Sequence, residues 1–205
     1  MKTNYPASFR RLAKAFFATA FFLAPLVCVR ATTVEPPSFS ELVADAQLVV
    51  RATVTAINSE WAESPQGKFI RTFVTISVEK HLKGTSDPTV VLQFLGGTVG
   101  QDNMVVSGMP TFKEGDTGIL FIAGNGTNFC PLVRMMHGRY RLLTEGAARR
   151  RYVARDDGLP IEQAEDVGLS LSAGTMLRRT RAPARALSLE NFEAQIVEEA
   201  RRHAK

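Results

Sequence analysis

The sequence predicts a mainly β fold, a small antiparallel barrel or sandwich with a short helix before it and a C-terminal helix after it. Two stretches, 47–57 and 70–82, alternate apolar and polar residues with a period of two, which is the pattern of half-buried strands. Glycines separate the shorter apolar runs that follow. No stretch between these runs has the length and the 3.6-residue period of the crossover helices that a parallel sheet requires.

The first 31 residues are typical of a cleavable secretory signal peptide. Basic residues come first, then an apolar run from Ala15 to Val29, and then the small-residue pattern Val29-Arg30-Ala31. Pro25 interrupts the apolar run, which is shorter than the roughly 20 apolar residues of a membrane span. We therefore expect a mature chain that starts at Thr32 and is secreted or periplasmic. Membrane attachment would require an uncleaved leader.

The leader also accounts for the positive net charge of the chain. It holds five of the 25 basic residues and none of the 20 acidic ones, so the remainder carries 20 of each. A nucleic-acid groove needs a basic surface with stacking aromatics. The barrel segment, residues 32–144, has nine basic and ten acidic residues. We therefore predict no nucleic-acid partner.

The expected N-terminal helix covers residues 38–45, with Ser40 as its N-cap and with Leu42 and Val43 on its inner face. Two long strands follow it. The inner face of strand 47–57 is expected to hold Val50, Ala52, Val54 and Ala56. The inner face of strand 70–82 is expected to hold Ile70, Thr72, Val74, Ile76 and Val78.

The rest of the chain predicts shorter elements. Strands are expected at 89–95, 103–106, 118–123, 132–136 and 139–143, with an edge strand at 149–154. Residues 168–183 lack a sustained apolar period, and the stretch 155–186 is predicted to be an irregular linker. Apolar residues at helical spacing after Ser188, the expected N-cap, predict a helix. The expected domains are therefore a barrel at 32–154, the linker at 155–186 and the helix at 187–205.

Three segments carry a resemblance to a known family. They are Ala44-Asp45-Ala46-Gln47-Leu48-Val49-Val50-Arg51-Ala52, Leu82-Lys83-Gly84, and Lys113-Glu114-Gly115-Asp116 leading into Ile119-Leu120-Phe121-Ile122-Ala123-Gly124. In this order they resemble the netrin-like module, the OB-like barrel shared by tissue inhibitors of metalloproteinases. With segments 96–100 and 107–112 added, the chain resembles a group of exported bacterial proteins still more. The resemblance covers residues 39–143 and implies an OB-like barrel.

The inhibitors in that family use an N-terminal Cys-x-Cys, whose amine and carbonyl chelate the zinc of the protease. The expected mature chain begins Thr32-Thr33-Val34-Glu35 and keeps Cys130 as its single cysteine. The resemblance therefore implies the fold and not the inhibitory mechanism.

The sequence offers little for catalysis or metal binding. Beyond the leader, the cysteine and histidine residues that could bind a metal are Cys130, His81, His137 and His203. Cys130 and His137 would approach each other if residues 132–136 formed one strand, but a metal site needs three or four ligands. Neither Gly-x-Ser-x-Gly nor His-Glu-x-x-His occurs. We predict no cofactor, metal or catalytic residue, and a hydrolase that uses Cys130 and His137 is the less favoured alternative.

Four residues are candidates for ligand binding. Trp61 is expected in the loop between the first two strands, either in contact with a ligand or as a lid over a barrel end. Gly97, Thr98 and Ser107 belong to the glycine-rich region that follows the third strand. We therefore predict an exported, non-enzymatic binding module for a protein or a glycan. The alternative is a protease-directed inhibitor of the netrin-like type.

Overall fold

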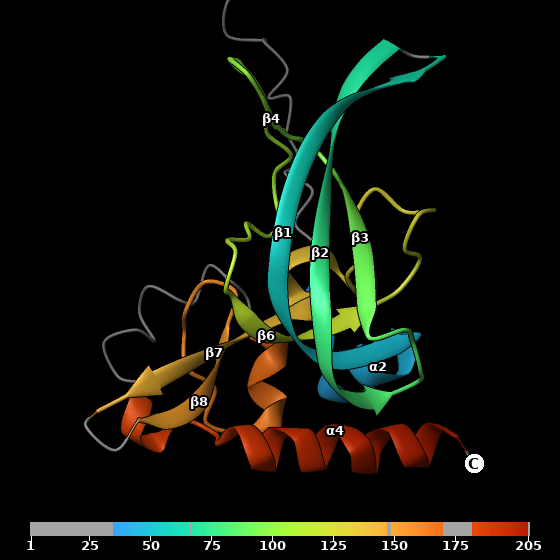
Figure 1. Cartoon of the computed structure of the whole chain (residues 1–205). Coiled ribbons are helices and arrows are strands. Elements are labelled where there is room, and N and C mark those ends of the chain that lie inside the picture. Colours follow the sequence, from blue (N-terminus) through green and yellow to red (C-terminus); the bar gives the residue numbers. More distant parts are fainter. Residues whose placement is uncertain (1–34, 66, 147–148, 170–181, 205) are drawn as a thin grey trace, which may run out of the picture. The chain divides into compact units, whose positions relative to one another are not determined.

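The computed structural model describes residues 35–65, 67–146, 149–169 and 182–204 (Figure 1). The predicted leader, the start of the mature chain and residues 170–181 lie outside the described residues. All described residues belong to one compact unit, Val34–Lys205. No helix in these described ranges is both long enough and apolar enough to cross a membrane.

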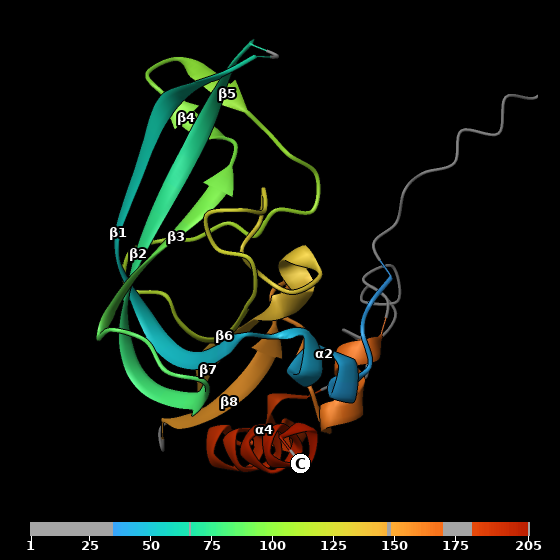
Figure 2. The same cartoon turned by 90° about the vertical axis from the view of Figure 1, so that its right-hand side faces the viewer.

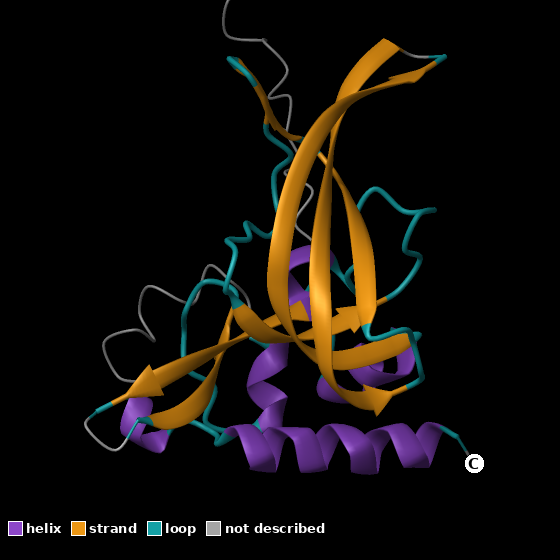
Figure 3. Ribbon diagram, viewed as in Figure 1, coloured by secondary structure: helices purple, strands orange, loops and turns teal. Residues whose placement is uncertain are grey.

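Six antiparallel strands form one sheet in the order β3-β2-β1-β6-β7-β8 (Figure 3). Their bounds are Leu48–Ser64 for β1, Gly67–Lys83 for β2, Thr89–Leu95 for β3, Thr117–Ile122 for β6, Arg139–Glu145 for β7 and Arg150–Arg155 for β8. A separate hairpin pairs β4 (Gly97–Val99) with β5 (Asp102–Met104), and the helices are α2 (Phe39–Asp45) and α4 (Leu189–His203). The predicted mainly β, antiparallel fold with two helices is confirmed. The sheet is curved and open, because β3 and β8 do not pair with each other in the described chain.

β1 bends, and the bend gives the sheet two parts. Its pairing with β2 shifts register three times, between Val49 and Val50, between Arg51 and Ala52, and between Val54 and Ala56. Such bulges bend a strand and increase its twist. The first half of β1 pairs with both β2 and β6, whereas the second half continues with β2 as a long ribbon (Figure 1). The prediction that Ala56 faces inward is wrong: this residue follows the third shift and is exposed.

The sheet buries apolar side chains on both faces. In β6, Ile119 and Phe121 belong to a cluster with α2 and α4, whereas Leu120 and Ile122 belong to a second cluster inside the curve. Val49 and Val50 divide between the two clusters in the same way. The second cluster is called the inner core below.

The helix caps differ in part from the prediction. The N-cap of α2 is Ser38 and not Ser40: the Ser38 hydroxyl accepts from the Glu41 amide, and the Glu41 carboxylate accepts from the Ser38 amide at 2.8 Å. This reciprocal capping box satisfies two donors at once. Ser40 instead donates to Glu199 of α4 at 2.6 Å. Ser188 is the N-cap of α4, as predicted.

Two stretches differ from the predicted elements. The strand expected at 132–136 does not form, because Arg134 and Met135 have φ of 50° and 60° and turn the chain into the 3-10 helix η2 (Met135–Gly138). The described part of 155–186 contains two 3-10 helices, η3 (Ala164–Gly168) and η5 (Pro183–Arg185), with irregular segments beside them. It packs into the core through Leu159 and Ile161, both fully buried.

Both edges of the sheet are covered. Along β3, the Asn125 side chain accepts from the Gln93 amide and donates to the Val91 carbonyl, while the Phe129 carbonyl accepts from the Leu95 amide at 2.8 Å. Along β8, hydrogen bonds reach residues 159–161 and 187. Covered edges prevent a further strand from pairing there.

We predict that Phe192→Ala destabilises the protein by about 3–5 kcal/mol, since it empties a fully buried site in α4. The Phe192 ring lies 5.3 Å from the Tyr140 ring and 6.0 Å from the Phe39 ring. Urea denaturation gives the free energy of unfolding. The exposed neighbour Asn191→Ala is the control and should change it by about 0.5 kcal/mol or less. Equal effects of the two variants would contradict the packing of α4 on the sheet.

Candidate functional site

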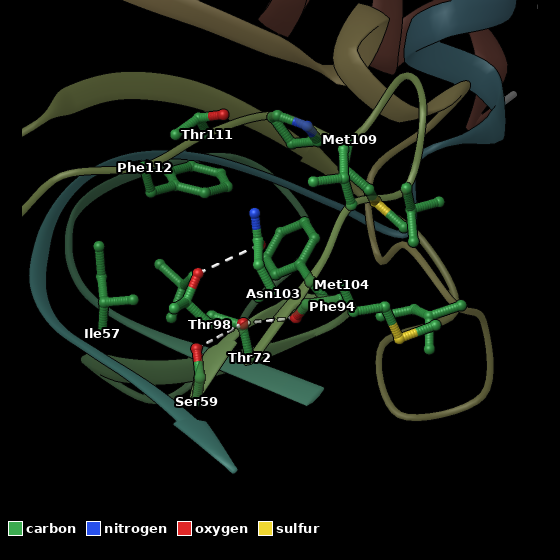
Figure 4. Close-up of a pocket in the computed structure, with 17 residues that line it drawn as sticks. Ile57, Ser59, Thr72, Phe94, Thr98, Asn103, Met104, Met109, Thr111 and Phe112 are labelled. Carbon is green, nitrogen blue, oxygen red and sulfur yellow. Dashed lines mark hydrogen bonds between the residues drawn. The ribbon is translucent and has the colours of Figure 1, made fainter. Parts of the chain in front are cut away.

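The inner core opens into a cavity of about 370 Å³, which we call the trough (Figure 4). The β1–β2 ribbon, the end of β3, the β4–β5 hairpin and the segment 105–112 surround it. Its main apolar side chains are those of Ile57, Val74, Phe94, Met104, Met109 and Phe112. Because several of these also pack against the inner core, the trough is a continuation of that core to the surface.

The polar groups of the trough bond mostly to one another. The hydroxyls of Ser59 and Thr72 lie 2.8 Å apart, and Thr72 also donates to the Gly96 carbonyl at 2.6 Å. Thr98 donates to the Asn103 side chain at 3.2 Å across the β4–β5 hairpin (Figure 4). The hydroxyl protons of Ser59, Thr72 and Thr98 are therefore all donated within the protein.

Gly97 brings the hairpin against this hydroxyl pair. A Cβ atom at residue 97 would lie 2.1 Å from the Thr72 hydroxyl and 2.7 Å from the Ser59 hydroxyl, and the backbone has φ of +134°. Only glycine fits both the space and the backbone conformation. The predicted candidate Gly97 is therefore a point of close approach between two parts of the site.

A buried arginine holds the wall of the trough that includes Phe112. The Arg139 guanidinium, with 5% of the residue exposed, lies 4.2 Å from the centre of the Phe112 ring and donates to the Thr111 carbonyl. It also forms ion pairs with Asp116 at 2.7 Å and with Asp156 at 2.9 Å. Burial raises the pKa of Asp156, and the Arg139 charge opposes that rise. The wall is thus fixed to the sheet before any ligand arrives.

The seventeen described residues that line the trough include no Asp, Glu, His, Cys, Lys, Arg or Tyr. Cys130 lies in the inner core and is buried, and burial raises the pKa of its thiol to about 11. The segment between Cys130 and His137 is not a strand, and His137 is buried in η2. No group of three or more metal-ligating side chains gathers in the described part of the chain.

The four predicted site residues lie in different places. Gly97 and Thr98, both in β4, line the trough. Trp61 is not in a loop, since β1 extends to Ser64 and places Trp61 opposite Ile70 in the ribbon, 47% exposed. Ser107 is exposed in the turn after β5. Neither Trp61 nor Ser107 lines the trough.

The sequence patterns did not reveal the aromatic and methionine lining or the role of Arg139. The Arg139 side chain meets Asp116, 23 positions away, and Thr111, 28 positions away. No local spacing marks such a contact. The sequence feature that could have indicated a loop packed on the inner core is the segment Pro110 to Phe112, which follows a glycine turn.

Comparison with protein families and with curated proteins finds no match for this chain. The netrin-like resemblance rests on the sequence segments alone.

Gly97→Ala is expected to destabilise the protein by about 1–3 kcal/mol more than Gly100→Ala, because the added methyl group overpacks the Ser59–Thr72 contact. Gly100 is the control in the same hairpin: its φ of +62° lies in the left-handed region that alanine can adopt, and its Cβ position has open space, so the difference also includes the backbone strain at the φ of +134° of Gly97. Urea denaturation of both variants measures the difference. Equal losses would mean that the hairpin does not pack as described.

Cys130 should react slowly with iodoacetamide at pH 7.5. A thiol pKa near 11 leaves about 100-fold less thiolate than a free thiol has, so alkylation should be at least about 100-fold slower than in the denatured chain. A Cys28→Ser background leaves Cys130 as the single thiol. Rapid alkylation of the folded protein, with rates that reveal a pKa below about 8, would restore the hydrolase alternative.

Proposed function

We propose that this protein is an exported, non-enzymatic binding module whose trough receives an apolar side chain of a partner protein. The observation that carries the proposal is the lining of the trough: methionine, valine and phenylalanine side chains beside neutral hydroxyl and amide groups, with no titratable group among the described lining residues. General acid–base and nucleophilic catalysis both require such groups. Binding does not require them.

The size and composition of the trough favour an apolar guest. Its volume lies at the lower end of the roughly 300–1,000 Å³ of ligand sites, which suits one or two side chains. Met104 and Met109 are flexible and polarisable, so they can adjust to the shape of a guest. Val105, on the rim, is 80% exposed and offers further apolar surface.

A protein partner is favoured over a glycan by the state of the polar groups. Sugar recognition relies on free donors and acceptors around an aromatic face, whereas the hydroxyl protons of Ser59, Thr72 and Thr98 are already donated within the protein. Strand addition at the sheet edges is disfavoured because β3 and β8 are covered. A partner segment is therefore expected to insert side chains into the trough.

The proposed location outside the cytoplasm rests on the leader-like first 31 residues. A protease-directed inhibitor of the netrin-like type would be a special case of the same binding function, with a protease as the partner. No contact among the described residues of the trough favours a protease over another protein.

The test is a selection from a random-peptide display library, run in parallel with a glycan array, against the purified protein. We expect peptides with an apolar anchor residue, and Val105→Asp should weaken their binding about tenfold or more, because it places a charge at the rim. Val91→Asp is the matched control: Val91 is an exposed valine of β3 that does not line the trough. Selective glycan binding that Val105→Asp abolishes would reassign the ligand class. Binding that both variants leave unchanged would remove the trough as the site.

A further inference from the structure

A second cleft lies on the other face of the β2–β3 sheet, and Arg71 lines it. Successive residues of a strand face opposite sides, so Thr72 lines the trough while Arg71 lines this cleft. The cleft has a volume of about 230 Å³ and lies between β2, β3 and residues 126–129. We call it the Arg71 cleft.

Two aromatic rings flank the Arg71 guanidinium. Its central carbon lies 5.7 Å from the centre of the Phe69 ring and 5.6 Å from that of the Phe73 ring, both on the same face of β2. Cation–π contacts of this kind hold the planar group in place without using its N–H donors. The Arg71 side chain is therefore held in position by contacts that leave its N–H donors without a protein acceptor among the described residues.

Among the described residues, no protein group uses those donors. The Arg71 side chain forms neither a hydrogen bond nor an ion pair there, and its buried Nε has no hydrogen-bond partner. Glu60 lies directly opposite in the β1–β2 pairing, yet these two described side chains form no ion pair. By contrast, Arg51 and Arg139 of the same sheet each pair with two carboxylates. A buried donor without a partner is costly and calls for an explanation.

The other walls of the Arg71 cleft are amide and apolar groups. Gln93, Asn128 and the 55% exposed Phe129 are among the residues that line it. Asn125 fixes the loop that carries Phe129, through its two hydrogen bonds to β3. The volume is below the roughly 300 Å³ at which drug-sized sites begin, so the cleft suits a group of side-chain size.

We propose that the Arg71 cleft binds a carboxylate attached to an aromatic or aliphatic group. The planar guanidinium can donate two parallel hydrogen bonds to a carboxylate, and the rings of Phe69 and Phe129 contact the attached apolar group. Arg71 is the single charged residue among the described residues that line the cleft, which suits a ligand with a single negative charge. A phosphate dianion needs more positive charge or more backbone donors. The Arg71 cleft and the trough lie on opposite faces of β2, and Phe94 and Leu95 of β3 line both of them.

The test uses the full chain with 3-phenylpropionate as the probe and its uncharged amide, 3-phenylpropionamide, as the matched comparison. Titrations followed by NMR should move the Arg71 Nε–Hε signal, and the acid should bind about tenfold or more tighter than the amide. Inorganic phosphate is a third arm and should bind more weakly than the acid. Equal binding of acid and amide, or tighter binding of phosphate, would overturn the proposal without any variant.

Three variants assign the effect to Arg71. Arg71→Gln should weaken binding of the acid about tenfold, while Lys68→Gln, which removes an exposed cation from the same strand, should change it less than about twofold. Glu60→Gln should tighten it slightly, because a competing negative charge is removed. An unchanged affinity in Arg71→Gln, or an equal loss in Lys68→Gln, would contradict the assignment. These titrations do not use the library-selected peptides, so a failure of this proposal can be told apart from a failure of the proposed function of the trough.

Discussion

The contacts of the buried Arg139 guanidinium are those on which the trough most depends. They join the start of β7 to Asp116 just before β6, to Asp156 just after β8, and to the trough wall at Thr111 and Phe112. Removing a cation from water costs several kcal/mol unless oxygen acceptors and opposite charges surround it. Here two carboxylates and a carbonyl do so. These contacts hold the trough wall in place in the protein alone, which would lower the ordering cost of binding for the proposed partner.

The bend in β1 determines how the two faces of the sheet are used. Before the bend, both faces are buried, one by α2 and α4 and the other by the inner core. After the bend, the β1–β2 ribbon continues without β6, and the β4–β5 hairpin lies beside it (Figure 2). Thr72 and Arg71, adjacent in sequence, thus belong to an apolar trough and to a cationic cleft.

Local patterns predicted much of the fold. The period of two predicted β1 and β2, the bounds of β3 match the prediction, and Ser188 caps α4 as expected. The differences arise where a single residue changes the backbone direction. The backbone of Arg134 is in the left-handed conformation, so the strand expected at 132–136 does not form. The bulge before Ala56 turns the side chain of that residue outward. Of the site, Gly97 and Thr98 were predicted from the glycine-rich region. Arg139 was not, because its partners come together only in the folded chain.

Amide hydrogen exchange of the wild type and of Arg139→Met tests the role of this arginine most directly. In the wild type, the amides of Met109, Lys113 and Gly115 are hydrogen-bonded next to the Arg139 contacts. We expect the variant to speed exchange at these amides at least about tenfold relative to the amides of Ile119 and Phe121 in β6. An equal change at both sets would show that Arg139 stabilises the whole fold without specifically holding the trough wall. No change at either set would contradict the central role given to this side chain.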